Sequence, residues 1–356
     1  MRTEDASESL AVSPKVPLSV LDLSPIAMGG TATDALHRSL DLARHTEEWG
    51  FRRYWVAEHH NMAGIASAAT AVVMGYLAEG TNHMRIGSGG VMLPNHAPLV
   101  VAEQFGTLES LYPGRIDLGI GRAPGTDPLT MRALRRDNRN QERDFPALLD
   151  ELRSYFEVNR EGMAEGRVRA IPGRGLTVPI WLLGSSDFSA QLAAHLGLPF
   201  AFAGHFAAEN TQIALSLYRS YFQPSAVLER PYAMLGVSVI AADSDEQAKY
   251  LATTPMQKYL QILRGKINAA QMMPPVDSMT ALYWDERERD AIEKRFANAI
   301  VGSPSMVKER LGQLLETTQA DELIIQSEIF NHDDRLHSYE ILASLRIGST
   351  RSHEPK

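Results

Sequence analysis

Cysteine is absent from the 356 residues of this chain, which excludes disulfide bonds and metal sites built on thiolates. A reducing compartment suits such a sequence, so we expect a cytoplasmic protein. Basic residues are also few, 35 against 43 acidic ones, for a net charge of -8. Nucleic-acid phosphates favour a basic face, so this balance argues against a nucleic-acid partner.

Long hydrophobic runs are missing as well. The longest nearly apolar stretch, Ile65–Ala78, is too short to span a bilayer and indicates a buried helix. Residues 1–15 are polar and acidic, without the basic start and apolar core of a signal peptide. We therefore expect a disordered N-terminal tail and no association with a membrane.

What is present is a regular alternation of short strand-like and longer helical patterns, and 44% of the residues are hydrophobic. Strands are expected at residues 16–24, 51–58, 83–93, 115–122, 178–184, 198–204, 232–243 and 322–327. Helices are expected at residues 35–50, 63–80, 99–114, 144–159, 189–197, 210–222, 303–316 and 334–345. Residues 160–176 indicate a loop or small hairpin, and residues 246–300 a mostly helical connection.

Eight strand–helix units without a linker predict one α/β domain, a (β/α)8 TIM barrel over residues 16–346. It carries an insertion after the fourth strand and a long helical excursion between the seventh and eighth. Residues 347–356 are then a C-terminal tail. A dinucleotide-binding doubly wound fold fits less well, because no Gly-x-Gly-x-x-Gly follows the first strand.

Functional side chains of such a barrel gather at the carboxyl ends of its strands. These ends carry Glu58-His59-His60, Ser88-Gly89-Gly90, Gly119-Ile120-Gly121-Arg122, Gly184-Ser185-Ser186 and Gly204-His205. Strand alternation places His59 on the face of Trp55 and Ala57. It places Arg122 on the face of Ile116, Leu118 and Ile120. We expect His59 and Arg122 to face one pocket, with space for a flat ligand beside Gly119 and Gly121.

An anion is the ligand expected beside Arg122. The helix that follows residues 178–184 starts with free backbone N–H groups near Ser185 and Ser186, and helix starts favour phosphate. A guanidinium suits the same anion. Small residues together with a phosphate site fit flavin mononucleotide (FMN).

Other interpretations of these residues stay open at this point. His59 and His60 could be metal ligands, but no third ligand stands at a diagnostic spacing, so no metal site is predicted. They could instead hydrogen-bond with Glu58. Arg122 could pair with Asp117 or Asp127, Ser185 and Ser186 could only cap their helix, and Gly89-Gly90 could form a bulge.

Several stretches together resemble the bacterial-luciferase-like flavin monooxygenases. The matching runs include YWVAEHHNMAGIASAAT, MRIGSGGVMLPNHAPLVVAEQF, LYPGRIDLGIGRAPGTD and PIWLLGSSDFSAQLAAHLGLPFAFAGHF, and they occur in order over nearly the whole chain. The similarity is greatest to the single-chain branch with EHH, LPNHAP and GRAPGTD signatures. It implies a (β/α)8 barrel that binds reduced FMN (FMNH2), supplied by a separate NAD(P)H-dependent flavin reductase.

The resemblance also implies a reaction and roles for residues. Dioxygen adds to the flavin C4a carbon, and the resulting C4a-peroxyflavin oxidises a small organic substrate. His59 is then the catalytic residue, an acid/base group or hydrogen-bond partner of the flavin. The cofactor-binding residues would be His60, Ser88, Gly89, Gly90, Arg122, Gly184, Ser185 and Ser186. A non-proline cis peptide bond is expected at Gly89-Gly90.

Departures from the family pattern limit what transfers. Luciferase has a reactive cysteine where this chain has Gly121, so aldehyde specificity and light emission do not follow. Luciferase pairs two unlike chains, whereas a single chain suggests a homodimer. Three rivals remain: an F420-dependent oxidoreductase, a non-catalytic flavin-binding protein and a metal hydrolase.

Overall fold

The computed structural model describes residues 15–123, 127–134, 141–158, 168–266, 269–282, 285–345 and 347–348. Most of the two predicted tails, and residues 159–167 of the predicted loop, lie outside the described residues. The strands are β1 Leu18–Asp22, β2 Arg53–Val56, β3 Arg85–Ser88, β4 Val91–Met92, β5 Ile116–Gly121, β6 Ile180–Gly184, β7 Phe200–Phe202, β8 Ala233–Ala241, β9 Ile300–Gly302 and β10 Glu322–Gln326.

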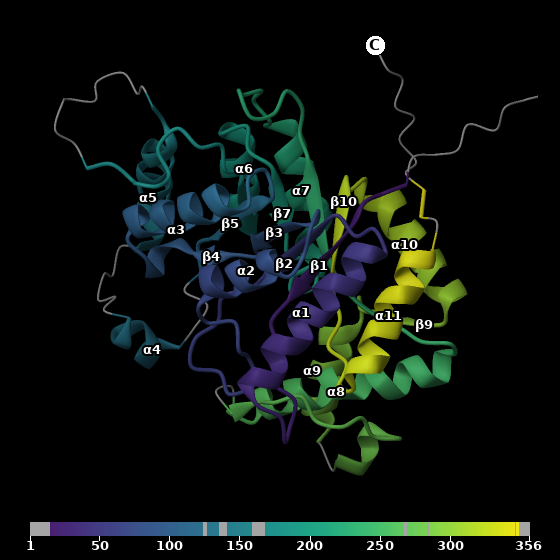
Figure 1. Cartoon of the computed structure of the whole chain (residues 1–356). Coiled ribbons are helices and arrows are strands. Elements are labelled where there is room, and N and C mark those ends of the chain that lie inside the picture. Colours follow the sequence, from purple (N-terminus) through teal and green to yellow (C-terminus); the bar gives the residue numbers. More distant parts are fainter. Residues whose placement is uncertain are drawn as a thin grey trace, which may run out of the picture.

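The helices surround these strands (Figure 1). They are α1 Ala32–Glu48, α2 Thr70–Glu79, α3 Pro98–Leu111, α4 Pro128–Ala133, α5 Gln141–Phe156, α6 Asp187–His195, α7 Thr211–Ser220, α8 Asp245–Leu263, α9 Glu286–Phe296, α10 Pro304–Thr318 and α11 His332–Ser344. None of the described helices is long and apolar enough to cross a membrane.

Eight parallel strands close into a barrel, which confirms the predicted fold. Their order is β1-β2-β3-β5-β6-β7-β8-β10, and β10 closes the ring because it pairs with both β8 and β1. All eight correspond to predicted strands. The short strands β4 and β9 were not predicted as separate elements; they extend the sheet beside β5 and β8.

Two apolar layers form the core. The larger layer lies between the strands and the surrounding helices, and it includes Ile116, Leu118 and Ile120 of β5. The smaller layer fills the inside of the barrel. In that inner layer the rings of Trp55 and Trp181 meet edge to face, with centroids 5.2 Å apart.

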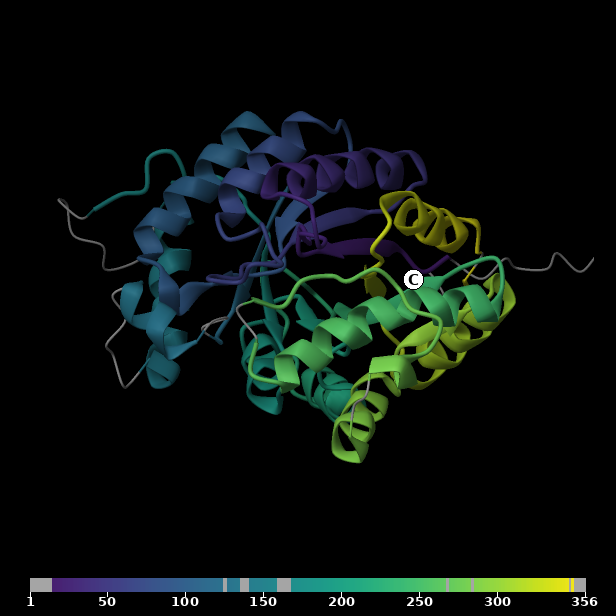
Figure 2. The ribbon, with the colours of Figure 1, turned by 90° about the horizontal axis from the view of Figure 1, so that it is seen from below.

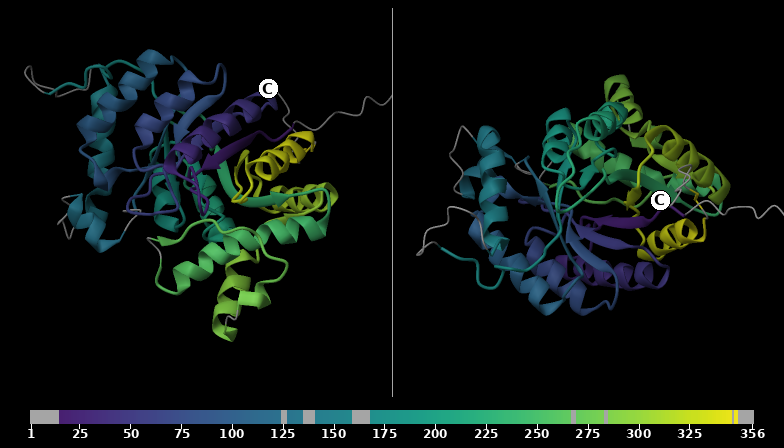
Figure 3. Two further views of the ribbon diagram at one scale, coloured as in Figure 1. Left: turned by 60° about the horizontal axis from the view of Figure 1, so that its bottom comes forward. Right: turned by 90° about the horizontal axis from the view of Figure 1, so that it is seen from above.

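The helical excursion lies across the barrel at the carboxyl ends of the strands, where α8 and α9 are seen in light green (Figures 2 and 3). It is less helical than predicted. Helix α8 ends before Gly265, which has a φ of 77° and so ends the helix in a left-handed conformation. Backbone carbonyls of Met273 and Pro274 then accept hydrogen bonds from Thr254 and Gln257 of α8.

The helix predicted at residues 63–80 starts only at Thr70. The residues before it pair with the chain after β1 instead of with themselves. Ile26 N–H donates to Gly64 O at 2.9 Å, and Ala66 N–H donates to Ser24 O at 3.0 Å. Tertiary pairing therefore overrides the apolar helical pattern of this segment.

Candidate active site

A cavity of about 250 Å³ opens at the carboxyl ends of the strands. Seven of the nine predicted site residues line it: His59, Gly89, Gly90, Arg122, Gly184, Ser185 and Ser186. They come from the ends of β2, β3, β5 and β6, which are consecutive in the ring. The other two predicted residues, His60 and Ser88, are not among the lining residues.

His59 lies where the alternation of β2 predicts. Trp55 and Ala57 belong to the inner layer of the barrel, and His59 continues their face into the cavity. Its side chain also borders a second cavity described below. His59 therefore stands at the boundary between two spaces.

His60 turns to a different partner. Its Nε2 lies 3.0 Å from Glu58 Oε1, and Nε2 of His96 lies 2.9 Å from the same oxygen. The N–H of Met92 donates to Glu58 Oε2 at 3.1 Å. Among the residues described, no cluster of three or more His, Cys, Asp or Glu side chains has a geometry that could hold a metal ion.

Arg122 reaches the cavity, but not for the predicted reason. The face it was assigned to, with Ile116, Leu118 and Ile120, packs outward against the helices. Strand β5 ends at Gly121, so its alternation does not extend to Arg122. The guanidinium carbon of Arg122 lies 4.6 Å from the ring centroid of Phe188, in the first turn of α6.

The carboxylates suggested as partners of Arg122 are engaged elsewhere. Asp117 accepts from Arg53 at 2.6 Å and from Arg85 at 2.7 Å. Asp127 caps α4 by accepting from the N–H groups of Leu129 and Thr130. No salt bridge to Arg122 is found among the described residues.

The start of α6 faces the same cavity as Arg122. Ser186 is the N-cap residue, but its side chain makes no capping hydrogen bond. The first backbone N–H groups of α6 are thus not satisfied by a side-chain cap, and they carry the positive end of the helix dipole. Arg122 and this helix start are thus two groups of one cavity that could hold an anion.

Glycines form the wall of the cavity at the end of β3, and neighbouring atoms pack closely against them. The Gly89-Gly90 peptide bond is cis, as the resemblance led us to expect. A Cβ atom on Gly90 would lie 2.7 Å from Gly119 O, and one on Gly89 would lie 2.7 Å from Leu21 Cδ1. Ser88 supports this arrangement from outside the cavity, since its hydroxyl donates to Gly119 O at 2.8 Å. The space predicted beside Gly119 is therefore filled by protein, whereas Gly89, Gly90 and Gly121 line the cavity.

A second cavity of about 230 Å³ adjoins the first and shares Leu23, His59 and Phe206 with it. Its walls are mainly apolar and come from the barrel, from α8 and from the segment around β9. The apolar residues that line it are Leu23, Met62, Ile65, Phe206, Ile240, Ala252, Pro255, Met256, Ile262, Ala270, Phe296, Ala299 and Val301. Each cavity alone is smaller than a typical ligand pocket of about 300–1,000 Å³. A cofactor and a substrate bound together would therefore occupy both cavities.

The charged groups of the second cavity are Lys258, Arg295 and Glu328. Lys258 and Glu328 form an ion pair with little solvent exposure, which links α8 to the end of β10. Sequence reasoning missed all three residues. Lys258 and Arg295 lie in helical stretches rich in polar residues, where a charged side chain is typically solvent-exposed.

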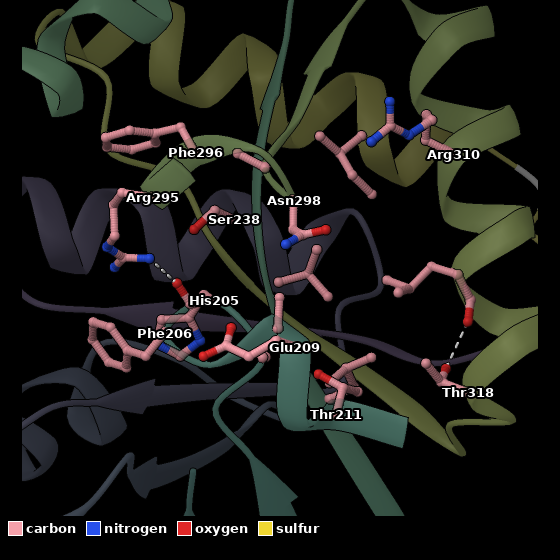
Figure 4. A pocket seen from close by; sticks show the side chains of 18 of the residues that line it. His205, Phe206, Glu209, Thr211, Ser238, Arg295, Phe296, Asn298, Arg310 and Thr318 are labelled. Carbon is pink, nitrogen blue, oxygen red and sulfur yellow. Dashed lines mark hydrogen bonds between the residues drawn. The ribbon is translucent and has the colours of Figure 1, made fainter. Parts of the chain in front are cut away.

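A third, larger cavity of about 760 Å³ lies outside the barrel wall, between α7, α9 and α10 (Figure 4). It shares His205, Phe206 and Gly236 with the first cavity. Burial and the positive charge of Arg295 lower the pKa of His205 to about 4. His205 is therefore a neutral imidazole at pH 7.

Comparison with known proteins gives this geometry a context. Residues 16–322 match the family model described as luciferase-like monooxygenase. YvbT of Bacillus subtilis is 57% identical over 92% of this chain and 96% of its own length. The luciferase-like monooxygenase of Escherichia coli K12 is 50% identical over 93% of this chain and 97% of its own length. The N-acetyl-S-alkylcysteine monooxygenase of Bacillus subtilis is 34% identical over 94% and 100%.

Solved structures show the same fold. Apo-MsnO8 has a TM-score of 0.84 and 35% identity, covering 92% of this chain and 97% of its own. The oxygenating constituent of 3,6-diketocamphane monooxygenase from Pseudomonas putida, in complex with FMN, has a TM-score of 0.72 at 16% identity, covering 94% and 98%. An F420-dependent secondary alcohol dehydrogenase has a TM-score of 0.65 at 13% identity, covering 92% and 98%.

The barrel, its cavity and these relatives together define an oxidoreductase of the (β/α)8 class. More narrowly, the chain belongs to the luciferase-like monooxygenase family, because the family model and close relatives match nearly its whole length. The resemblance drawn from the sequence is thereby confirmed.

Proposed function

We propose that this protein is a flavin-dependent monooxygenase that uses FMNH2 and dioxygen to oxidise a small organic substrate. The observation that carries the proposal is the first cavity, which joins an anion site at Arg122 and α6 to His59 across a glycine-lined wall. A separate NAD(P)H-dependent reductase would supply the reduced flavin. On the family resemblance we also propose a homodimer, which sedimentation velocity would test.

The residues of the chain would divide the binding of FMN between them. Arg122 and the first N–H groups of α6, with Gly184, Ser185 and Ser186, would hold the phosphate. The ring would lie against Gly89 and Gly90. Ser88 would position that wall through its bond to Gly119, and His60 would act indirectly, through its hydrogen bond to Glu58, which lines the cavity.

Reduced flavin, when bound, supplies the electrons and the site of oxygen activation. The contribution of the protein is binding, orientation and exclusion of water. His59, at the boundary between the flavin and substrate spaces, would donate or accept a proton there. The apolar walls of the second cavity and the overlying α8 would keep water away from both reactants.

The names of the relatives support a monooxygenase rather than an F420-dependent dehydrogenase. Relatives named as monooxygenases are 50% and 34% identical to this chain, whereas the F420-dependent dehydrogenase is 13% identical and shares only the fold. The relative that acts on an N-acetyl-S-alkylcysteine supports a small organic substrate.

Anaerobic titration with FMNH2 and with reduced F420 tests the cofactor. We expect FMNH2 to bind more tightly than reduced F420, and Arg122→Ala to weaken FMNH2 binding roughly 10- to 100-fold. Arg132→Ala is the matched control, because Arg132 lies on α4 and donates to Pro128 O, away from the lining residues. Tighter binding of F420 would contradict the proposal.

Rapid mixing of the FMNH2 complex with oxygen tests the role of His59. We expect the wild-type protein to return to oxidised FMN through a spectrally distinct phase that is slower than the oxidation of free FMNH2. His59→Ala should bind FMNH2 but lose this phase. If His59→Ala reoxidises like the wild type, His59 is not the catalytic residue. If the wild type also lacks the phase, the protein is a flavin binder without oxygenase activity.

A further inference from the structure

The second cavity combines apolar walls with one guanidinium that has no carboxylate partner. Arg295 lines both this cavity and the third cavity, whereas His59 lines the second and the first. Both residues thus line the second cavity, and each also borders a different neighbouring cavity. A ligand in the second cavity would have one end toward the cofactor site and the other toward Arg295.

Aromatic rings hold Arg295 in place. Its guanidinium carbon lies 5.2 Å from the ring centroid of Phe206 and 5.9 Å from those of Tyr259 and Phe296. One of its N–H groups donates to the backbone oxygen of His205, as the dashed line in Figure 4 shows. Such a cage fixes the planar group and leaves its other donors for a ligand.

The acidic groups near Arg295 do not neutralise it. Glu328 is engaged by Lys258, and Glu209 is solvent-exposed, so its charge is screened. Over the part of the chain that the structure describes, no carboxylate forms a salt bridge with Arg295. His205 is neutral at pH 7. The second cavity thus holds one uncompensated positive charge.

We propose that the second cavity binds the substrate as a small monocarboxylate with an apolar body, and that Arg295 binds its carboxylate. The proposal rests on the proposed function and names the substrate class of the same site. The apolar body would extend between α8 and the barrel toward His59. Oxidation would then occur on the apolar part, remote from the carboxylate.

Other ligand classes fit this cavity less well. A neutral apolar ligand would displace water from Arg295 without replacing its hydrogen bonds, which costs affinity. A cation would be repelled by the guanidinium. A singly charged carboxylate matches both the charge of Arg295 and its forked donor geometry.

Calorimetric titration with octanoate and with octanamide tests the proposal, because the two probes share a chain and differ in charge. It is run on the protein as isolated and again saturated with FMN. In at least one form we expect octanoate to bind roughly 10- to 100-fold more tightly than octanamide. Arg295→Met should reduce octanoate binding to the level of octanamide, and Arg295→Lys should keep part of the preference.

Arg310→Met is the matched control. Arg310 lines the third cavity, as Arg295 does, but it does not line the second cavity. This substitution also removes one positive charge, so the preference for octanoate should persist in the variant. Equal binding of the two probes, no binding of either, or a preference that survives in Arg295→Met would overturn the proposal. If Arg295→Met fails to fold, judged by circular dichroism, the wild-type ratio and Arg295→Lys decide.

Titration with FMNH2 separates this proposal from the proposed function. Arg295→Met should bind FMNH2 with wild-type affinity, since Arg295 does not line the first cavity. A carboxylate preference without FMNH2 binding would leave the site in place and reject the flavin function. FMNH2 binding without a carboxylate preference would reject the carboxylate site and leave the flavin function in place.

Discussion

A buried carboxylate explains why an acid precedes the two histidines at the end of β2. The side chain of Glu58 is 2% exposed and joins His60, His96 and the N–H of Met92. Burial alone would raise the pKa of Glu58, but the hydrogen bonds from His96 and His60 outweigh it and lower the pKa. Glu58 thereby ties the LPNHAP segment to β2 and fixes the backbone on both sides of His59.

His205 makes the stability of the protein depend on pH. Its pKa is lowered to about 4 from 6.5, so below pH 6.5 the unfolded chain takes up a proton that the folded chain does not. The free energy of unfolding should therefore fall as the pH drops from 6.5 to 4, by about 3 kcal/mol in total.

Urea unfolding of the wild type and of His205→Gln across this range measures that contribution. The difference between the two proteins should change by this amount between about pH 8 and pH 4, in favour of the variant at low pH. A constant difference would show that the pKa of His205 is the same in the folded protein and in the unfolded chain.

Alanine substitutions at Gly90 and Gly312 test how closely atoms pack at the wall of the cavity, because a Cβ atom would be crowded at Gly90 and free at Gly312. Alanine at Gly90 would bring a Cβ atom within 2.7 Å of Gly119 O, so we expect a loss of roughly 1–3 kcal/mol in unfolding free energy. Alanine at Gly312, inside α10 with nothing within 4 Å, should stabilise by about 0.5–1 kcal/mol. Thermal unfolding distinguishes the two, and a neutral Gly90→Ala would contradict the crowding.

Site residues were predictable from the sequence where a strand end fixes them. His59 follows the alternation of β2, and Ser185 and Ser186 follow from the start of α6. Strand alternation groups Arg122 with residues of β5 that point outward, so it does not explain why Arg122 lines the cavity. Arg295 and Lys258 carried no signal, because their burial depends on how the excursion packs.

At the scale of elements, strands were predicted well and the excursion poorly. The eight barrel strands are short apolar runs that become buried in the closed ring. Their sequence pattern and their packing therefore favour the same structure. Residues 246–300 include the run after Gly265, whose structure depends on contacts with α8 rather than on its own pattern. Strand β9 has three residues and exists because the end of β8 offers it a partner.

The ion pair between Lys258 and Glu328 should decide how firmly α8 is held over the cavities. Lys258→Met removes the cation that hydrogen-bonds to Glu328 in a site of low exposure, while Arg335 and Arg295 remain nearby, so we expect a loss of about 1–3 kcal/mol. Hydrogen exchange should increase more in α8 than in the barrel strands.

Two controls give this prediction its meaning. The double variant Lys258→Met/Glu328→Met should recover most of the loss, since no charge is left unpaired. Arg264→Met breaks a different ion pair, which joins the end of α8 to Glu288 of α9. The Arg264 side chain is 41% exposed, so the loss in unfolding free energy should be less than about 1 kcal/mol. Equal effects of Arg264→Met and Lys258→Met would refute the special role of the buried pair.

At the scale of the whole molecule, a buried charge network ties distant parts of the chain together at the amino end of the barrel. Arg53 of β2 lies 2.6 Å from Asp117 of β5 and 3.0 Å from Glu322 of β10, and both carboxylates are fully buried. Its guanidinium carbon also lies 4.8 Å from the ring centroid of Trp181. One side chain thus connects strands from both ends of the sequence inside the closed ring.

Arg53→Met should therefore destabilise the entire barrel. Two fully buried carboxylates each lose one of their paired cations, so we expect the free energy of unfolding to fall by about 3–5 kcal/mol. Because the network is shielded from solvent, urea unfolding should give the same loss at low and at high salt concentration. The triple variant Arg53→Met/Asp117→Asn/Glu322→Gln should be more stable than Arg53→Met alone. A loss that shrinks with added salt would mean that the network is open to solvent and that apolar packing alone holds this end of the barrel.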